Sequence, residues 1–148
     1  MSIEHDLRGN FSSGPGRMQA MKLHVDFHET PLTSGNIARL FNVPKGILID
    51  HIKVNRKLAE GGTATIDVGL YAQSNDAAID ADGLLDGTDI NATGYVASRP
   101  GVLAEAAPNT YNPAYSNGYL ATVDAWVGVL ANNDLDLAQL DIELFYIA

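Results

Sequence analysis

The carboxylates best placed to do chemistry in this chain lie in an acidic run between residues 80 and 89. Four of these ten residues are aspartates, namely Asp80, Asp82, Asp86 and Asp89. Calcium takes about six to eight oxygen ligands, and carboxylates commonly supply them. The run lacks the spacing of an EF-hand loop, because no acidic or amide residue stands two positions after Asp82 and no glutamate closes the loop. Since Asp-Gly steps are also ordinary turn chemistry, a cation site and a solvated, turn-rich loop are both open interpretations.

The four histidines form no evident metal motif. His24 and His28 are four residues apart on a predicted strand, so they share its polar face but lie far apart along it. His5 falls in the N-terminal segment, and His51 falls on another predicted strand. Solvated positions on strand faces are the simpler expectation, and the sequence predicts no metal and no cofactor.

Catalytic patterns are equally sparse. The chain has no cysteine, which excludes a thiol nucleophile, a thiolate metal site and a disulfide. There is no Gly-x-Ser-x-Gly elbow and no phosphate-cradling glycine loop. The one carboxylate pair worth naming for glycoside chemistry is Asp124 with Asp141 or Glu143, on strands expected to be adjacent. We therefore predict that the protein is not an enzyme.

Aromatic residues gather in the last third of the chain. Tyr111, Tyr115, Tyr119 and Trp126 lie within a short stretch, and tyrosine and tryptophan favour interfaces and sugar-stacking sites. Packing of Tyr119 and Trp126 in the core is an equally good interpretation. A carbohydrate-binding module is thus an alternative to a purely structural protein.

The elements that must position these residues are strands. In the stretch 63–71, Ala64, Ile66, Val68 and Leu70 alternate with polar or small residues, which is typical of a strand with one buried face. Similar alternation predicts strands over 18–28, 47–58, 92–98, 119–130 and 135–147, and a strand or a short helix over 36–43. The alternation slips near Asp50 and His51, which predicts a bulge or a bend.

The connections between these elements are also expected from composition. We predict a short hairpin loop at 59–62, a long acidic loop over 73–91 with room for a short helix at 77–85, and an irregular segment over 102–118. About seven or eight strands joined by Gly, Pro and Asn turns predict an all-β fold, an antiparallel β-sandwich of jelly-roll or Greek-key type.

The N-terminal segment 1–17 is expected to differ from the single domain at 18–148. It contains three glycines, one proline and three serines, and its apolar residues are sparse. Such a segment cannot build a core. We predict an extended N-terminal arm, either loose or ordered only against a partner, with Ile3, Leu7 and Phe11 as apolar anchors.

The net charge of the chain and its distribution limit the classes of partner that the protein can bind. The net charge is −9, which argues against nucleic acid, because phosphate binding needs clustered Lys and Arg. Residues 1–57 hold eight Lys/Arg and five Asp/Glu, a net charge of +3, whereas residues 58–148 hold one and thirteen, a net charge of −12. No apolar run approaches the roughly 20 residues that span a bilayer, and the first residues lack a secretory apolar core. We therefore expect no membrane partner and assembly in a cytoplasm.

Several of these features together resemble a known family. A Gly/Ser-containing arm is followed by a Val-Pro-Lys-Gly turn at 43–46, the stretch Gly-Gly-Thr-Ala-Thr-Ile-Asp-Val-Gly at 61–69, and an Asp-Gly loop at 85–91. Over residues 36–148 the chain resembles small structural proteins of tailed bacteriophages. The resemblance is strongest to the cement or decoration proteins on heads built from an HK97-like shell, and related sandwiches also occur in tails and fibres.

The resemblance implies a non-enzymatic virion protein on the capsid surface, assembled in the host cytoplasm. It implies the major capsid protein as partner, self-association as a homotrimer, and capsid stabilisation as function. A carbohydrate- or receptor-binding module of a phage tail or fibre is the alternative. The expected partner-binding residues are four in the arm and three basic residues after it: Arg8, Asn10, Phe11, Arg17, Lys22, Arg39 and Lys45.

Overall fold

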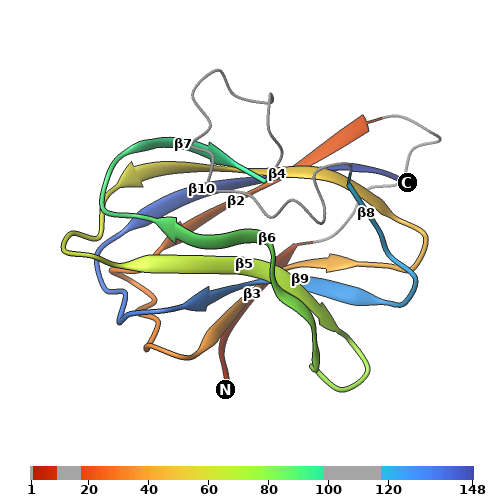
Figure 1. Ribbon diagram of the computed structural model, residues 1–148, viewed down its shortest axis with the longest axis horizontal. Helices are drawn as coiled ribbons and strands as arrows, with labels where there is room; N and C mark the ends of the chain where they lie inside the picture. The colour runs from red at the N-terminus through yellow and green to blue at the C-terminus, as the bar shows by residue number, and fades with distance from the viewer. Residues whose placement is uncertain (1, 10–17, 99–117) are drawn as a thin grey trace.

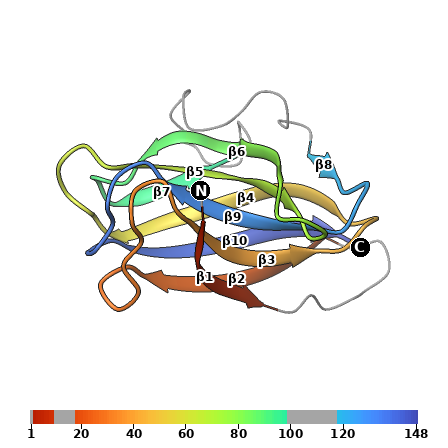
Figure 2. The ribbon, with the colours of Figure 1, turned by 90° about the horizontal axis from the view of Figure 1, so that it is seen from below.

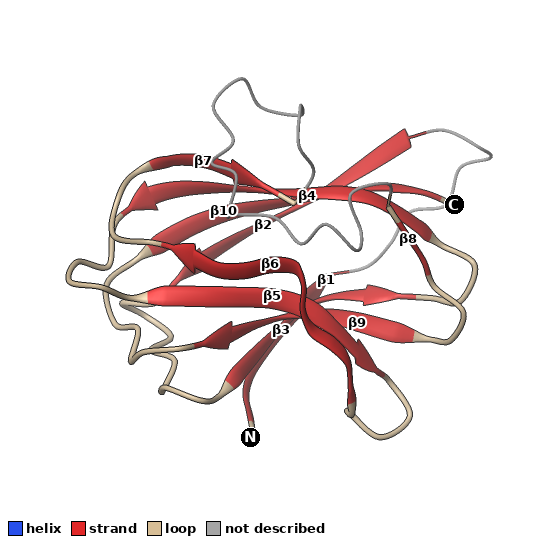
Figure 3. Ribbon diagram, in the orientation of Figure 1, coloured by secondary structure: helices blue, strands red, loops and turns tan. Residues whose placement is uncertain are grey.

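The computed structural model describes residues 2–9, 18–98 and 118–148, and in this part of the chain every regular element is a strand (Figure 3). The strands are β1 (Ile3–Gly9), β2 (Met18–Asp26), β3 (Ile37–Val43), β4 (Leu48–Leu58), β5 (Thr65–Ala72), β6 (Ala78–Asp89), β7 (Gly94–Ala97), β8 (Tyr119–Leu120), β9 (Ala125–Ala131) and β10 (Gln139–Ile147). Within the described ranges there is consequently no helix that crosses a membrane.

The strands form two sheets packed face to face (Figures 1 and 2). Sheet A has the order β1-β3-β9-β5-β6, and sheet B has the order β2-β10-β4-β7, with β8 pairing to one end of β4. The predicted β-sandwich is confirmed. One pair departs from the antiparallel pattern, because β1 runs parallel to β3.

Eight of the strands pair in nested fashion. The first of the eight pairs with the last (β2 with β10), the second with the seventh (β3 with β9), the third with the sixth (β4 with β7), and the two middle strands pair with each other (β5 with β6). All four pairs are antiparallel, so the chain is a long hairpin rolled into two sheets. This is a jelly roll, one of the two types of sandwich, jelly roll or Greek key, that the turn and strand pattern predicted.

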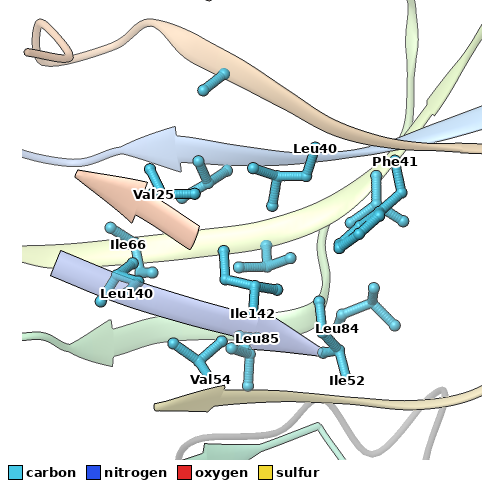
Figure 4. Packing of buried hydrophobic residues seen from close by; sticks show 14 of the residues in the cluster. Val25, Leu40, Phe41, Ile52, Val54, Ile66, Leu84, Leu85, Leu140 and Ile142 are labelled. Atoms are coloured by element: carbon cyan, nitrogen blue, oxygen red, sulfur yellow. The ribbon is translucent and has the colours of Figure 1, made fainter. Parts of the chain in front are cut away.

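The core lies between the sheets, where alternate residues of each strand meet (Figure 4). On β10 the buried residues are Leu140, Ile142, Leu144 and Tyr146, and on β5 they include Ile66, Val68 and Leu70, as alternation predicted. The predicted bulge in β4 is also present. His51 stands opposite Phe145 while Ile49 stands opposite Tyr146, so Asp50 has no partner of its own in the ladder.

The acidic segment is a strand, and the predicted long loop over 73–91 with a short helix is wrong. Residues Ala78–Asp89 form β6 along β5, but the register is irregular. Val68 pairs with Leu85 and Leu70 pairs with Asp80, so four residues of β6 bulge out between two ladder positions. The bulge accommodates Asp-Gly steps that composition alone assigns to a loop, while Leu84 and Leu85 still reach the core.

Two further expectations are wrong. Residues 59–62 do not close a hairpin, because β4 belongs to sheet B and β5 to sheet A. The predicted strand 119–130 is two pieces: β8 pairs with β4, and β9 begins at Ala125 after a bend in which Val123 is 46% exposed. The alternation continues through the bend, although the backbone leaves one sheet for the other.

The N-terminal segment is part of the fold at residues 3–9, so the expectation of ordering only against a partner is wrong for this stretch. The Glu4 carboxylate accepts hydrogen bonds from the Thr33 backbone N–H at 2.8 Å and from Asn36 Nδ2 at 3.2 Å. These bonds lower the pKa of Glu4. Leu7 packs against the main core and Ile3 packs against a second cluster. Asn10, Phe11 and Arg17 lie outside the described residues.

The bulged half of β6 crosses over the outer face of sheet A at Gly69 (Figure 1). A Cβ at Gly69 would lie 2.2 Å from the backbone carbonyl oxygen of Asp80 and 2.2 Å from the carbonyl carbon of Ala81. Its neighbour in the ladder is Gly128, where a Cβ would lie 2.5 Å from the Trp126 ring. The glycine pair therefore makes a trough that lets β6 and Trp126 lie flat on the sheet.

We predict that Gly69→Ala destabilises the protein by about 3 kcal/mol or more, because the added methyl collides with backbone that cannot rotate away. Gly128→Ala meets side chains, which have more room to adjust, so we expect a loss of about 1–3 kcal/mol. Urea unfolding of the two variants measures both losses. Equal stability of Gly69→Ala and the natural chain would show that β6 does not cross at this distance.

Glu60 stabilises the connection that leads from β4 in sheet B to β5 in sheet A. Its Oε1 accepts a hydrogen bond from the Asp136 N–H at 2.8 Å, and its Oε2 accepts from the N–H groups of Leu137 at 3.0 Å and Ala138 at 2.7 Å. Burial raises the pKa of Glu60, but the three backbone donors outweigh it and the net shift is downward. The carboxylate thus ties the β4–β5 connection to the segment before β10.

We predict that Glu60→Gln costs about 1–2 kcal/mol of unfolding free energy at neutral pH, since a neutral amide accepts these bonds less strongly. Because folding lowers the pKa, the charged form contributes stability above the ordinary value of 4.5, and that contribution is lost as the pH falls through the folded pKa. The stability gap between the two proteins should close in acid. A gap that widened below pH 4.5 would contradict the assignment.

Candidate functional site

The outer face of sheet B presents a ladder of charges across three strands. Its central strand, β10, contributes acids, and its neighbours β2 and β4 contribute bases. Glu143 stands opposite Lys22 on β2 and Lys53 on β4, and its Oε1 lies 3.9 Å from the Lys22 Nζ. The register that buries alternate residues of β10 therefore also fixes this ladder on the opposite face. We call this surface the sheet B face.

The shortest contact of the sheet B face joins His24 to Asp141. The His24 Nδ1 lies 2.5 Å from the Asp141 Oδ1, and the Lys57 Nζ lies 3.3 Å from the Asp141 Oδ2. The hydrogen bond from His24 lowers the pKa of Asp141 against the smaller opposing effect of burial, and Lys57 lowers it further. These groups are substantially exposed, so the pairs contribute little to stability. The paired lysine side chains nevertheless remain at the surface, where a partner could contact them.

A shallow groove of about 360 Å³ runs along the sheet B face. Its lining residues are Lys22, Leu23, His24, Asn55, Lys57, Tyr95, Asp141 and Glu143. Tyr95 is 51% exposed at its rim, and tyrosine is a frequent anchor residue at protein interfaces. In a chain of net charge −9, this groove combines three bases with two acids and an exposed aromatic ring, which suits a protein–protein contact.

The sheet B face continues at His51 and Phe145, whose rings stack at 4.4 Å between centroids. The His51 Nδ1 lies 2.6 Å from the Asp50 Oδ2, and the Lys53 Nζ lies 5.4 Å from the centre of the Phe145 ring. A cation over an aromatic ring keeps its charge accessible while its stem covers apolar surface. The row of outward-facing side chains thus extends along β10 from Asp141 through Glu143 to Phe145.

The outer face of sheet A differs, because the chain covers part of it with its own residues. Trp126 and Tyr71 are fully buried there and stack at 4.3 Å between centroids. The Arg39 guanidinium lies 4.9 Å from the Trp126 ring centre and its Nη2 lies 2.8 Å from the Asp76 Oδ2, while the Trp126 Nε1 donates to the Asp76 Oδ1 at 3.1 Å. Sequence reasoning missed Asp76, because no local pattern connects it to a residue 50 positions away.

The seven predicted contact residues do not share one surface. Lys22 lies on the sheet B face, Arg39 lies on the sheet A face, and Lys45 is exposed in the turn between β3 and β4, where its backbone N–H donates to Asp124 at 2.9 Å. Arg8 lies in β1. The prediction that these residues contact a partner stays a prediction. Sequence reasoning missed Lys57 and Tyr95, and it named Asp141 only for a catalytic pair, because the strand order is needed to bring these three residues together.

The sequence left open a catalytic carboxylate pair, sugar stacking on aromatic rings, and a metal site. The carboxylate pair of Asp124 with Asp141 or Glu143 is wrong, because Asp124 precedes β9 of sheet A while the other two lie on β10 of sheet B. Trp126 is buried and cannot stack on a sugar, whereas Tyr111 and Tyr115 lie outside the described residues. In the described ranges, no three His, Asp or Glu side chains come close enough to hold a metal by themselves.

Comparison with known proteins identifies the fold. No protein-family model and no curated protein matches the chain. A chain in the capsid of Ralstonia phage GP4 is similar, with a TM-score of 0.64, 17% identity, and coverage of 99% of this chain and 96% of that one. A chain in the capsid asymmetric unit of cyanophage Pam1 is also similar, with a TM-score of 0.56, 12% identity, and coverage of 94% and 90%. These likenesses show a shared fold.

The burial of Trp126 gives a direct test, because the chain contains one tryptophan. We predict a blue-shifted native emission that iodide quenches poorly, and a red shift on unfolding. Trp126→Phe should cost about 1–3 kcal/mol through the lost Asp76 hydrogen bond and ring stacking. Tyr95→Ala is the control, with about 0.5 kcal/mol or less because Tyr95 is exposed. Efficient iodide quenching of the native protein would contradict the buried position.

Proposed function

We propose that this protein is a structural component of a tailed-phage virion, and that it acts as a cement or decoration protein on the outside of the capsid. Its partners would be the major capsid protein and further copies of itself, as a homotrimer on the assembled shell. The protein would be made and added to the particle in the host cytoplasm. Its action is mechanical: it contacts neighbouring shell subunits and resists their separation.

The observation that carries the proposal is the likeness to a chain in the capsid of Ralstonia phage GP4, which extends over 99% of this chain and 96% of that one. Coverage of both chains almost end to end means that the likeness extends over the whole architecture of each compared chain and is not confined to one part of it. The similar chain in the capsid of cyanophage Pam1, with its TM-score of 0.56, points in the same direction.

The chemistry of the described surface fits this proposal. The sheet B face brings together charges and an exposed tyrosine in a shallow groove, and the carboxylate pair considered for catalysis is separated between the sheets. Shallow contacts are weak one at a time. When many copies bind one lattice, however, their number makes the assembly stable by avidity. A small rigid sandwich suits this role, because little conformational entropy is lost on docking.

We propose the sheet B face as the surface that docks on the shell. Sheet A already buries part of its outer face, where Ile3 of β1 and Ala81 of β6 pack against the Tyr71 and Trp126 cluster. The basic side chains of Lys22 and Lys57 remain accessible on sheet B. Lys22 is 76% exposed at its side chain. Of the other predicted contacts, Arg8, Asn10, Phe11 and Arg17 in the N-terminal segment and Lys45 in the β3–β4 turn would add to the interface, whereas Arg39, on the opposite face of the sandwich, would contact a sister copy of the chain.

The protein should co-purify with intact particles at a fixed copy number relative to the major shell subunit. We predict that Lys22→Gln with Lys57→Gln reduces its binding to particles at least tenfold, because both changes remove cations from the docking face. The matched control is Thr63→Glu with Ser74→Glu, which shifts the net charge by the same two units at exposed turns outside this face. It should bind normally.

Pelleting of purified particles with each variant measures the effect. Failure of the natural chain to pellet with any particle fraction would refute the cement function, whereas equal binding of the two double variants would refute only the docking face. Deletion of residues 1–17 is a poorer test, because Ile3–Gly9 is a strand of sheet A and its loss disturbs the fold.

A further inference from the structure

One end of the sheet B face is apolar. Ile147, the last residue of β10, stands opposite Met18 on β2 and opposite Leu48 on β4. Leu48 in turn stands opposite Leu120 on β8. Because Tyr146 is buried in the core, the alternation along β10 directs Ile147 outward, and its row with it. The four residues therefore form one apolar row across four strands, at the end of the sandwich where the C-terminus and β8 lie (Figures 1 and 2).

A second row without formal charge adjoins the first. Phe145 stands opposite Ala20 on β2 and opposite His51 on β4, and the rings of His51 and Phe145 stack at 4.4 Å between centroids. The next outward row along β10 is the charged row of Glu143. The sheet B face thus changes from apolar to charged between neighbouring rows. We call the two apolar rows the apolar end, which consists of Met18, Ala20, Leu48, His51, Leu120, Phe145 and Ile147.

The apolar end is most exposed at its two edges. Met18 is 51% exposed and Leu120 is 56% exposed, although both are large apolar side chains. Between them, Leu48, Phe145 and Ile147 are half-buried. Single apolar residues are common on protein surfaces, but these residues are neighbours in one ladder. A contiguous exposed apolar patch with a polar rim marks a surface that binds another macromolecule.

The charge of the chain indicates which partner suits the apolar end. The net charge is −9, so copies of the chain repel one another where charged surfaces meet. In a closed oligomer of identical chains, residues beside the symmetry axis meet their own counterparts in the other copies. Like charges repel there, whereas apolar side chains bury one another's surface. The apolar end fulfils this condition, because His51 is its one titratable side chain and the Asp50 Oδ2 lies 2.6 Å from the His51 Nδ1.

We propose that the apolar end is the surface through which copies of this chain associate with one another. This location rests on the self-association that the proposed function includes. The copies bury Met18 and Leu120 beside the symmetry axis and leave the lysines of the charged rows accessible farther along the same face. Docking on the shell through Lys22 and Lys57 and association through the apolar end then use separate parts of one sheet.

Sedimentation equilibrium of the purified full chain tests the association without any particle. We expect the weight-average mass to rise above that of one chain between about 1 and 100 μM. The association should be unchanged or stronger in about 0.5 M NaCl, because salt screens ion pairs and does not weaken an apolar contact. A chain that stays monomeric over this range overturns the proposal. Association that NaCl weakens severalfold also overturns it, since the charged rows would then carry the contact.

Paired variants locate the contact. Met18→Ser with Leu120→Ser should weaken the association about tenfold or more, because both changes remove apolar surface from the apolar end. The matched control is Ile79→Ser with Leu137→Ser, which truncates side chains that are 38% and 43% exposed, on β6 of sheet A and before the first residue of β10. The control should associate like the natural chain. Equal association of the two double variants would refute the apolar end as the contact.

Thermal unfolding and particle pelleting complete the test. All four substituted side chains are substantially exposed, so both double variants should unfold within a few degrees of the natural chain. A natural chain that pellets with particles but stays monomeric in solution refutes the apolar end and leaves the cement function in place. A natural chain that associates in solution but pellets with no particle refutes the cement function alone.

Discussion

The pairing of β10 with both β2 and β4 is the contact on which the structure most depends. It joins the end of the chain to the first and third strands of the roll, and each neighbour pairs with nearly the whole length of β10. Inward, this register buries Leu140, Ile142 and Leu144 in the core. Outward, the same register sets acids between bases. The core and the candidate docking surface are thus two sides of one ladder.

The two outer faces differ because one is covered and the other is open. On sheet A, the glycines at 69 and 128 flatten the surface enough for β6 to cross and for Trp126 to be buried against Tyr71. Arg39 is engaged there by Asp76 within the chain. On sheet B, the outer face carries long polar side chains, the stacked rings of His51 and Phe145, and the exposed Tyr95. These exposed side chains are the groups that the proposed docking on sheet B would use.

The charged side chains of β2, β4 and β6 are also divided between the two sheets. The basic residues of β2 and β4 come from the first part of the chain, and the aspartates of β6 come from the second. The roll places β2 and β4 in one sheet and β6 in the other. The aspartates of β6 therefore lie in sheet A, whereas the lysines of β2 and β4 lie in sheet B beside the acids of β10. Such polarity orients a protein as it approaches a charged partner.

The sequence by itself determined which residues face inward, since alternation is a local property that a strand keeps in any sheet. This is why the buried residues of β5 and β10, the bulge at Asp50 and the jelly-roll class were predictable. Only the tertiary structure decided which strands are neighbours, and with them the groove of Lys57, Tyr95 and Asp141, the bond from Trp126 to Asp76, and the place of β1 beside β3. The acidic segment shows the limit most clearly: its Asp-Gly steps have the local chemistry of a loop, and pairing with β5 across a bulge makes it a strand.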